Sequence, residues 1–427
     1  MKSIAKADKL SAIWIMIAVF LSYTGMYAVR KSFLAGQYAD VNIGFGLDAK
    51  TTFVISQVFG YMVSKFLGIK IISEMPKNKR IVWLLSLILF GLAMLGLFAV
   101  LPDKLKIIAL FFNGLPLGIV FGLVFSFIEG RRNTELLAAA LSATFIFSTG
   151  LVKTAGLILM QSFGVSEFNM PFLTGLVFLP IFIVSLLMLK QAKTPDDKDV
   201  AERTARVPMY AKDRRDFLKA NGLGYFGLVA IYVLLTIIRD FRDNFIVDFW
   251  AEQGFSKAPQ LITLTEIPIA LIVLVIAAAC VLIRKNKLAF NFGIWLSVAS
   301  AMLILLSTLL YQEHNISPVL WIVTSGIGIY LPYILFHCLL FERLIALLNY
   351  KGNVGFLFYL ADALGYLGSV GVLILKEIVG LKQSWSVFFI SINHIAAVLM
   401  LIILILVQLY FNKKVSHHKL NKLTIVA

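Results

Sequence analysis

Long apolar runs are the feature that most constrains the fold of this chain. A membrane-spanning helix needs about 20 mostly apolar residues, and the 427 residues contain twelve such runs. In the first half they lie at about 11–36, 51–73, 81–101, 107–128, 136–163 and 170–189. In the second half they lie at about 222–249, 259–283, 288–311, 317–341, 353–375 and 386–411. We therefore expect an all-α integral membrane protein with twelve transmembrane helices.

The amino-acid composition excludes a soluble protein. Hydrophobic residues make up 60% of the chain and charged residues 15%, whereas soluble domains average about 45–50% and about 25%. A secreted enzyme, a nucleic-acid-binding domain and a disordered chain would each need far more polar surface. The two cysteines, Cys280 and Cys338, lie far apart in apolar runs, so we expect no metal site. The sequence contains no phosphate-binding loop of the G-x-x-x-x-G-K-[ST] kind, and we expect no cofactor.

A single long polar segment divides the twelve runs into six and six. We expect an N-terminal six-helix bundle at 1–189, a connector at 190–221, a C-terminal six-helix bundle at 222–412 and a basic tail at 413–427. Two pseudo-symmetric bundles are the layout of transporters that are built from repeats.

The distribution of Lys and Arg predicts the orientation in the membrane. If the N-terminus is cytoplasmic, the cytoplasmic segments hold 26 basic residues and the segments on the opposite side hold six. Cytoplasmic loops of membrane proteins carry such an excess. We therefore expect a multi-pass plasma (inner) membrane protein with both termini and the connector in the cytoplasm. The net charge of +16 follows from this topology, so the predicted partner is the lipid bilayer and not nucleic acid.

Several charged residues lie inside the predicted spans. The basic ones are Arg30, Lys31, Lys65, Lys70, Lys153, Arg239 and Arg242. The acidic ones are Asp240, Asp243, Glu266 and Asp362. A charge at the centre of a lipid-facing helix costs about 2.5–3.5 kcal/mol, so such residues normally face a bundle interior or an aqueous cavity. The excess of bases predicts a cavity that attracts anions. The alternative is structural pairing, with Arg242 bound to Asp240 or Asp243 and Lys153 to an acid on a neighbouring helix.

Two arginines occupy matching positions in the two halves. Arg30 lies 17 residues after Ile13, and Arg239 lies 17 residues after Gly222. The first and seventh helices are equivalent in a repeat architecture, so we expect both guanidinium groups to face one central cavity. Two such planar forks bind a phosphate or carboxylate bidentately. We also expect Asp240 or Asp243 to neutralise an arginine when no substrate is bound.

The sequence around these arginines resembles a known family. The run YAVRKSF from Tyr27 to Phe33 is similar to the Y-x-x-R-K-x-F segment of the organophosphate:phosphate antiporters, a branch of the major facilitator superfamily that includes the glycerol-phosphate and hexose-phosphate transporters. The run GYMVSKF at 60–66 resembles a second segment of that branch. The residues from Tyr232 to Arg239 resemble its tyrosine-rich seventh helix, and GYLGS at 365–369 resembles a packing segment of its eleventh helix.

This resemblance implies the major facilitator fold and assigns roles to five residues. Arg30 and Arg239 would be the phosphate-binding pair. Tyr27 would lie one turn before Arg30 on the same helix face, and Lys31 and Lys65 would supply positive potential near the cavity.

Three departures from the pattern indicate a divergent member of that branch. The loop after the second span, at 68–80, lacks the G-x-x-x-D-R-x-x-R pattern of the superfamily. The fifth span contains Lys153 where the antiporters use a histidine, and the eleventh span contains the extra acid Asp362. We therefore add Lys153, Asp240, Asp243 and Asp362 as candidate coupling groups or charge partners.

The expected activity is secondary active transport of a small anionic solute (a phosphate ester, phosphate or another organic anion) by alternating access, through exchange or gradient coupling. The alternative within transport is a proton-coupled symporter of another small solute, in which Asp362, Asp240 or Glu266 titrates. The alternatives of another class are an integral-membrane receptor and a lipid-headgroup enzyme. The five histidines are scattered along the chain, which disfavours the enzyme. We expect a monomer that is not an enzyme.

Overall fold

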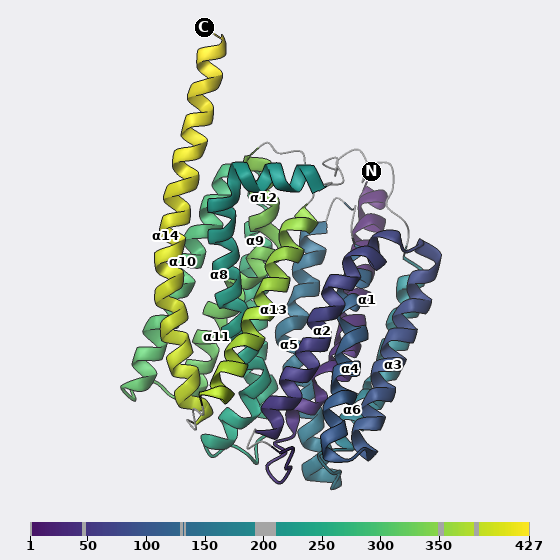
Figure 1. The fold of residues 1–427 in the computed structure, drawn as a ribbon. Helices are drawn as coiled ribbons and strands as arrows, with labels where there is room; N and C mark the ends of the chain where they lie inside the picture. The colour runs from purple at the N-terminus through teal and green to yellow at the C-terminus, as the bar shows by residue number, and fades with distance from the viewer. Residues whose placement is uncertain are drawn as a thin grey trace. The chain divides into compact units, whose positions relative to one another are not determined.

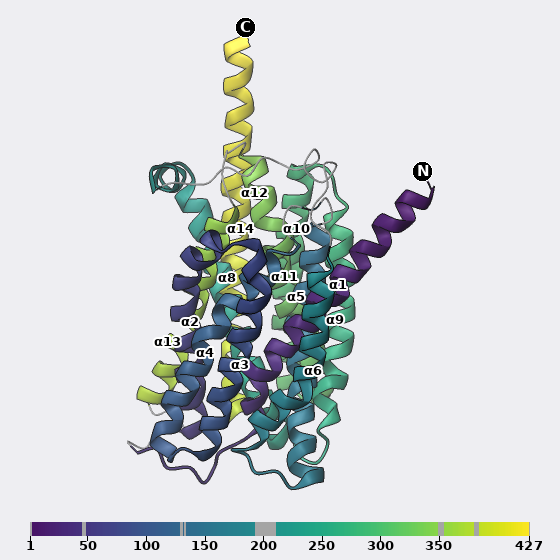
Figure 2. The same ribbon diagram turned by 90° about the vertical axis from the view of Figure 1, so that its right-hand side faces the viewer.

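The computed structural model describes residues 2–44, 48–128, 131, 134–192, 211–348, 354–379 and 384–426. Within these ranges all regular secondary structure is helical (Figures 1 and 2). The predicted all-α class is therefore confirmed. Most of the predicted connector, at 193–210, lies outside the described residues, as do the side chains of Lys70 and Glu74.

The first half of the chain forms six long helices and two 3-10 turns. They are α1 (Lys2–Lys31), η1 (Ser32–Ala35), α2 (Ala49–Glu74), η2 (Lys77–Lys79), α3 (Arg80–Val100), α4 (Asp103–Phe125), α5 (Thr134–Phe163) and α6 (Met170–Lys190). The second half contributes α8 (Ala211–Glu252), α9 (Gln260–Val281), α10 (Asn286–Gln312), α11 (Pro318–Leu335), η3 (Phe336–Leu340), α12 (Phe341–Leu347), α13 (Val354–Ile378) and α14 (Trp385–Val426).

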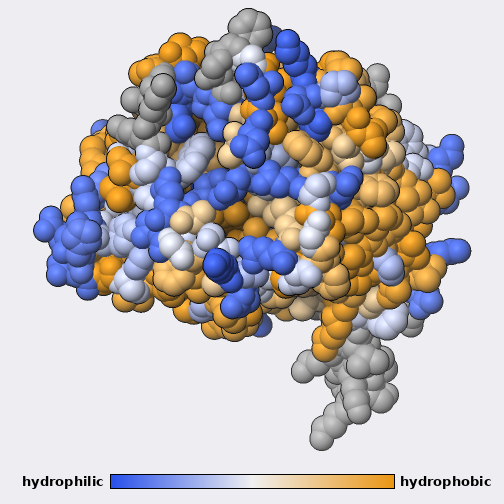
Figure 3. All heavy atoms as spheres, turned by 90° about the horizontal axis from the view of Figure 1, so that it is seen from below, coloured by the Kyte–Doolittle hydropathy of each residue, from blue (hydrophilic) through white to orange (hydrophobic). Residues whose placement is uncertain are grey.

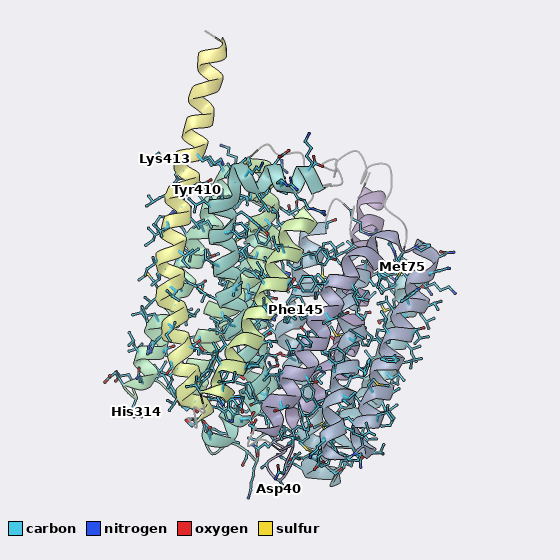
Figure 4. The ribbon with its side chains drawn as sticks, viewed as in Figure 1. Asp40, Met75, Phe145, His314, Tyr410 and Lys413 are labelled. Carbon is cyan, nitrogen blue, oxygen red and sulfur yellow. The ribbon has the colours of Figure 1, made fainter. Side chains whose placement is uncertain are left out.

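Eleven spans among the described residues are long and apolar enough to cross a membrane. The second predicted span, α2, is not among them. Its 26 residues nevertheless cover about 39 Å at 1.5 Å per residue, which exceeds the thickness of a bilayer core of about 30 Å. Asp40 before α2 and Met75 after it lie at opposite ends of their part of the molecule (Figure 4). The helix α2 therefore completes the predicted set of twelve.

Four helices differ clearly from the predicted spans. The helix α1 begins at Lys2 and not at 11, and α14 continues to Val426 instead of ending at 411. The helix α8 begins at Ala211, well before the expected start at 222, and its first turns bend away from the remainder (Figures 1 and 2). The charged stretch at 212–216 is followed by the fully buried Phe217, so an amphipathic turn extends the helix beyond its apolar part. The tenth span, predicted as one helix at 317–341, is divided into α11, the π-helical turn η3 and α12.

The described contacts group the chain into two compact units. Unit 1 comprises 1–203, 241–270 and 370–386, and unit 2 comprises 204–240, 271–369 and 387–427. The helix α8 thus contributes its first part, up to Asp240, to unit 2 and its second part, from Phe241, to unit 1. This division groups residues by contact and not by repeat, and the predicted bundle bounds stay a prediction.

Glycines allow α2 and α4 to pack closely in unit 1. A Cβ atom on Gly60 would lie 2.2 Å from the carbonyl oxygen of Phe111, and one on Gly114 would lie 2.1 Å from that of Gln57. Real Cβ atoms essentially never approach a backbone oxygen so closely. The two backbones are therefore in direct contact, and this contact fixes the positions of Tyr61 and Lys65 on α2.

In unit 2, α13 packs against α8 through the glycine run that the sequence resemblance marked. A Cβ atom on Gly365 would lie 2.7 Å from Oγ1 of Thr236, and one on Gly368 would lie 2.8 Å from Cγ1 of Val233. This close packing brings the two helices together at the level of the ionisable residues described below.

The outer surface suits a lipid environment. Large apolar side chains are exposed along the helices, among them Val100 at 77% and Leu406 at 59%. Figure 3 views the molecule from below relative to Figure 1, and the face that it shows carries both hydrophilic and hydrophobic atoms, with hydrophobic ones over much of its right-hand side. Extended exposed apolar surface of this kind marks contact with a membrane.

Candidate functional site

A cluster of two lysines and one aspartate lies in unit 1. The Nζ atom of Lys31 is 2.8 Å from Oδ2 of Asp243, and the Nζ atom of Lys153 is 2.6 Å from Oδ1 of the same carboxylate. Lys31 also donates a hydrogen bond of 2.9 Å to Oδ1 of Asn244, and Lys153 donates one to the backbone carbonyl of Asp243. We call Lys31, Lys153, Asp243 and Asn244 the lysine–aspartate cluster. The three charged side chains are at most 9% exposed.

Three helices supply this cluster. Lys31 is the last residue of α1, Lys153 lies in α5, and Asp243 follows the point at which α8 enters unit 1. Each carboxylate oxygen of Asp243 therefore binds an ammonium group from a different helix. With two bases and one acid, the cluster has a formal charge of +1 in a buried site.

Two further buried ion pairs connect α8 to other parts of unit 1. Nη1 of Arg242 lies 2.7 Å from Oε1 of Glu266 on α9. Nζ of Lys50, at the start of α2, lies 2.5 Å from Oδ2 of Asp248. Lys50 lies just outside the predicted second span, yet its side chain is almost fully buried. A buried Lys–Asp pair between distant segments leaves no local sequence pattern.

Arg30, Tyr61 and Lys65 form a second basic region in unit 1. The guanidinium carbon of Arg30 lies 3.5 Å from the centroid of the Tyr61 ring. Nζ of Lys65 lies 5.1 Å from the same centroid and 5.2 Å from that of Phe121. Cations over aromatic faces are stabilised by the ring quadrupole. Tyr27 lies one turn before Arg30 and is 3% exposed, so all four predicted site residues on α1 and α2, Lys31 included, are in the interior.

Unit 2 contains a network that surrounds Arg239. Nη1 of Arg239 donates a hydrogen bond of 2.7 Å to the Tyr333 hydroxyl, and Nη2 lies 2.5 Å from Oδ1 of Asp240. Nη2 also lies 3.4 Å from the Tyr366 hydroxyl. The guanidinium carbon is 4.3 Å from the centroid of the Tyr333 ring. The predicted substrate arginine is thus bound by one carboxylate and two phenols.

The same network continues to Asp362. The Tyr232 hydroxyl lies 3.1 Å from the Tyr333 hydroxyl, 3.0 Å from Oδ1 of Asp362 and 3.2 Å from Nε2 of His337. His337 lies in the π-helical turn η3, which follows Pro332 in α11. Short π-helical segments occur frequently at functional sites. We call this set the tyrosine–arginine cluster; it consists of Tyr232, Arg239, Asp240, Tyr333, His337, Asp362 and Tyr366.

The structure pairs the predicted charge partners selectively. Asp240 binds Arg239, as expected for a residue that neutralises an arginine, whereas Asp243 binds the two lysines. Lys153 pairs with an acid on a neighbouring helix, which is the structural alternative that the sequence left open. For Arg242 the sequence left open a pairing with Asp240 or Asp243 or a place at the outer interface; the structure pairs it with Glu266 on α9.

Arg30 and Arg239 belong to different units. Arg30 lies in unit 1 near Tyr61, and Arg239 lies in unit 2 within the tyrosine–arginine cluster. Their shared cavity stays a prediction, as does the role of each candidate site residue.

Sequence reasoning missed Tyr333 and His337 as site residues. The histidines were judged to be scattered, yet the backbone places His337 beside Tyr232 and Asp362. The available signal was Pro332 inside an apolar span, followed within five residues by the polar aromatic side chains of Tyr333 and His337. Proline inside a helix removes a backbone hydrogen bond and permits such irregular turns.

A separate pocket of about 380 Å³ lies in unit 1 at the ends of α5 and α8. Its lining includes Trp250, Phe255, Met160 and Glu167, and it includes none of the predicted site residues. Outside the spans, burial raises the pKa of Tyr38 well above its ordinary value and the carboxylate of Glu167 adds to this effect, so the Tyr38 phenol keeps its proton. Within the described part of the chain, no group of three or more His, Cys, Asp or Glu side chains could hold a metal ion.

Solved structures of transporters share this fold. A mutant of the nucleoside transporter NupG matches with a TM-score of 0.59 and 12% identity, covering 93% of this chain and 98% of that one. A D-xylose-proton symporter matches with a TM-score of 0.60 and 14% identity, covering 91% and 96%. The human organic anion transporter MFSD10 matches with a TM-score of 0.54 and 11% identity, covering 92% and 98%. These likenesses show the two-domain fold of the major facilitator superfamily and confirm the predicted fold class.

The resemblance to the organophosphate antiporters is not extended by these comparisons and stays a prediction. No curated protein matches the chain significantly in sequence. A family model described as "Family of unknown function (DUF5690)" matches residues 32–414, and the chain therefore belongs to this family.

Proposed function

We propose that the protein is a secondary active transporter of a small anionic solute. The shared fold of transporters for nucleosides, xylose and organic anions supports transport, and the buried charges support the sign of the solute. The proposal includes the predicted topology, with both termini on the cytoplasmic side, and a monomer as the functional form.

The observation that carries this proposal is the charge balance inside unit 1. Among its described residues, eight basic side chains are buried and three acidic ones are buried. The basic ones are Arg30, Lys31, Lys50, Lys65, Lys106, Lys153, Arg242 and Lys376; the acidic ones are Asp243, Asp248 and Glu266. Burial of a charge is unfavourable unless an opposite charge compensates it. An anion that enters this region would supply negative charge, whereas a cation would be repelled.

The tyrosine–arginine cluster supplies a binding mode for such an anion. A guanidinium fork binds phosphate or carboxylate oxygens bidentately. Asp240 occupies one side of the Arg239 guanidinium group, so an incoming anion competes with this carboxylate. Binding would then replace the ion pair between Arg239 and Asp240 with one between Arg239 and the solute. This replacement lowers the net free-energy cost of keeping Arg239 out of water.

The first experiment measures thermal stabilisation of the detergent-solubilised protein. Inorganic phosphate, glycerol 3-phosphate and succinate are compared with uridine and xylose at equal ionic strength. A ligand at 100 times its Kd stabilises the folded state by about 2.7 kcal/mol. We expect at least one anion to raise the Tm and to exchange in proteoliposomes, and stabilisation by uridine or xylose without any by an anion would contradict the proposal.

Arginine-to-lysine variants then test the site. Arg30→Lys and Arg239→Lys should each lower anion exchange by at least about tenfold, because an ammonium group cannot reproduce the planar fork and a hydrogen bond to a charged group contributes about 1.5–3 kcal/mol. The matched control is Arg284→Lys, since Arg284 is exposed. Unchanged exchange by both site variants would end the assignment of these arginines.

A further inference from the structure

We propose that Asp362, Tyr232 and His337 form a proton-binding site, and that a chain of hydrogen bonds transmits its protonation state to Arg239. The transporter would then move a proton together with its anion. This inference rests on the proposed function and adds a coupling ion and the residues that bind it.

The Tyr232 hydroxyl is the centre of the site. It lies within 3.2 Å of three polar atoms: the Tyr333 hydroxyl, Oδ1 of Asp362 and Nε2 of His337. A phenol has one proton and can donate only one hydrogen bond. Tyr232 can therefore donate to only one of the three neighbours. Each of the other two must donate to Tyr232 or form no hydrogen bond with it. The direction of the hydrogen bonds thus depends on which neighbour carries a proton.

When Asp362 is ionised, its carboxylate can only accept, so Tyr232 donates to it. The Tyr333 hydroxyl then donates to Tyr232, and its own oxygen accepts the hydrogen bond from Nη1 of Arg239. In this state both phenol protons are used inside the chain of hydrogen bonds, and neither is available to a bound solute.

When Asp362 is protonated, the direction reverses. The carboxylic acid donates to Tyr232, and Tyr232 donates to Tyr333. The oxygen of Tyr333 now accepts from both Tyr232 and Arg239, so the Tyr333 proton becomes available to a new acceptor beside the guanidinium group. A bound oxyanion at Arg239 is such an acceptor. Protonation of Asp362 therefore provides one more donor for the anion.

The charges act in the same direction. Among the described residues of unit 2, the printed contacts of this site join Tyr232, Arg239 and Asp240 on α8, Tyr333 on α11, His337 on η3, and Asp362 and Tyr366 on α13. With His337 neutral and both acids ionised, their formal charge is −1. Uptake of one proton by Asp362 brings it to zero, and this removes a charge that opposes anion binding.

The buried surroundings of this site keep its chain of hydrogen bonds intact. Tyr232, Tyr333 and Asp362 are at most 2% exposed. The rings of Phe336 and Phe358 pack against Tyr232 at 5.6 and 6.3 Å between centroids, and Phe358 packs against His337 at 4.5 Å. In such an apolar environment hydrogen bonds are strong and their direction is well defined.

The test compares phosphate binding by the wild type and Asp362→Asn between pH 5 and pH 8. Asparagine resembles the protonated acid, because it is neutral and its amide can donate to Tyr232. We expect the variant to bind inorganic phosphate as tightly as the wild type does at low pH. The wild-type affinity should fall relative to the variant as pH rises, approaching about tenfold per pH unit for one linked proton. The ratio of the two affinities cancels the titration of phosphate itself.

Two further variants sharpen the result. Tyr232→Phe keeps the carboxylate but removes the hydroxyl, so the pH dependence of the affinity ratio should flatten while phosphate still binds. Glu313→Gln is the matched control, because it neutralises an exposed carboxylate of the same unit, and it should follow the wild type. Identical pH profiles for the wild type, Asp362→Asn and Tyr232→Phe would overturn the proton site and leave anion binding intact.

A second measurement does not depend on any solute. Infrared difference spectra on acidification report the carboxylic acid band of a protonated side chain directly. We expect a band in the wild type and in Glu313→Gln that is absent from Asp362→Asn. If phosphate fails to bind to every variant, the solute proposal fails for this probe, and the infrared band still decides the proton site: its absence from the wild type overturns the site, and its selective loss in Asp362→Asn supports it.

Discussion

At the scale of single residues, Asp243 is the position on which the interior of unit 1 most depends. Its carboxylate binds the ammonium groups of Lys31 and Lys153 at 2.8 and 2.6 Å. Removing one partner of a buried ion pair destabilises a protein by about 3–5 kcal/mol, because the remaining charge is uncompensated. We expect Asp243→Asn to lower the Tm strongly, and Asp243→Asn combined with Lys153→Met to recover part of the loss.

The control for this prediction is Asp103→Asn. Asp103 binds Lys106 at 3.0 Å, but its side chain is 44% exposed. An exposed pair of this kind contributes about 0–1 kcal/mol. Equal losses for Asp103→Asn and Asp243→Asn in a thermal unfolding measurement would show that the lysine–aspartate cluster does not stabilise the fold.

At the scale of helices, the contact between α2 and α4 depends on the absence of side chains. A Cβ atom on Gly114 would lie 2.1 Å from the carbonyl oxygen of Gln57, and a backbone atom cannot move away as a flexible side chain can. Overpacking in a well-packed interior costs about 1–3 kcal/mol. We therefore expect Gly114→Ala to lower thermal stability and to displace α2, with a secondary loss of transport because α2 carries Lys65.

Gly371 provides the comparison, since it is also a helical glycine of unit 1 and a Cβ there would meet nothing within 4 Å. Alanine is favoured over glycine in helices by about 1 kcal/mol, so Gly371→Ala should be neutral or slightly stabilising. A similar decrease in Tm for both variants would rule out the close approach as the cause.

At the scale of the whole molecule, the important feature is that the second part of α8, from Phe241, belongs to unit 1 by its contacts. The pair between Lys50 and Asp248 links this part of α8 to the start of α2. Lys50→Met leaves a buried carboxylate without its partner. We expect faster hydrogen exchange in residues 241–252, because local opening follows the stability of the local contacts.

Lys106→Met is the matched control for the exchange measurement. Lys106 is another buried lysine of unit 1, but it contacts Asp103, the carbonyl of Leu101 and the ring of Phe168, none of which lies in α8. Exchange in 241–252 should remain at the wild-type rate in this variant. Unchanged exchange in Lys50→Met as well would mean that the ion pair does not hold α8 in unit 1.

The sequence by itself determined the class of the fold and the approximate positions of its long apolar helices. The physical reason is that a bilayer core requires an apolar run of fixed minimum length, and this requirement is local. The same cost of burying charge singled out Arg30, Lys31, Lys65, Lys153, Arg239 and Asp362, all of which are buried in the structure. Helix ends that leave the apolar zone, such as the start of α8 at Ala211, are not set by this rule and were not predicted.

Only the tertiary structure decided which charges meet. Asp240 and Asp243 are three residues apart, yet the first binds Arg239 in unit 2 and the second binds lysines from α1 and α5 in unit 1. Glu266 on α9 binds Arg242, and His337 joins Tyr232 through a π-helical turn. Each partner choice depends on how helices distant in sequence pack and turn about their axes. A single sequence specifies the cost of burying a charge, but the three-dimensional packing specifies its partner.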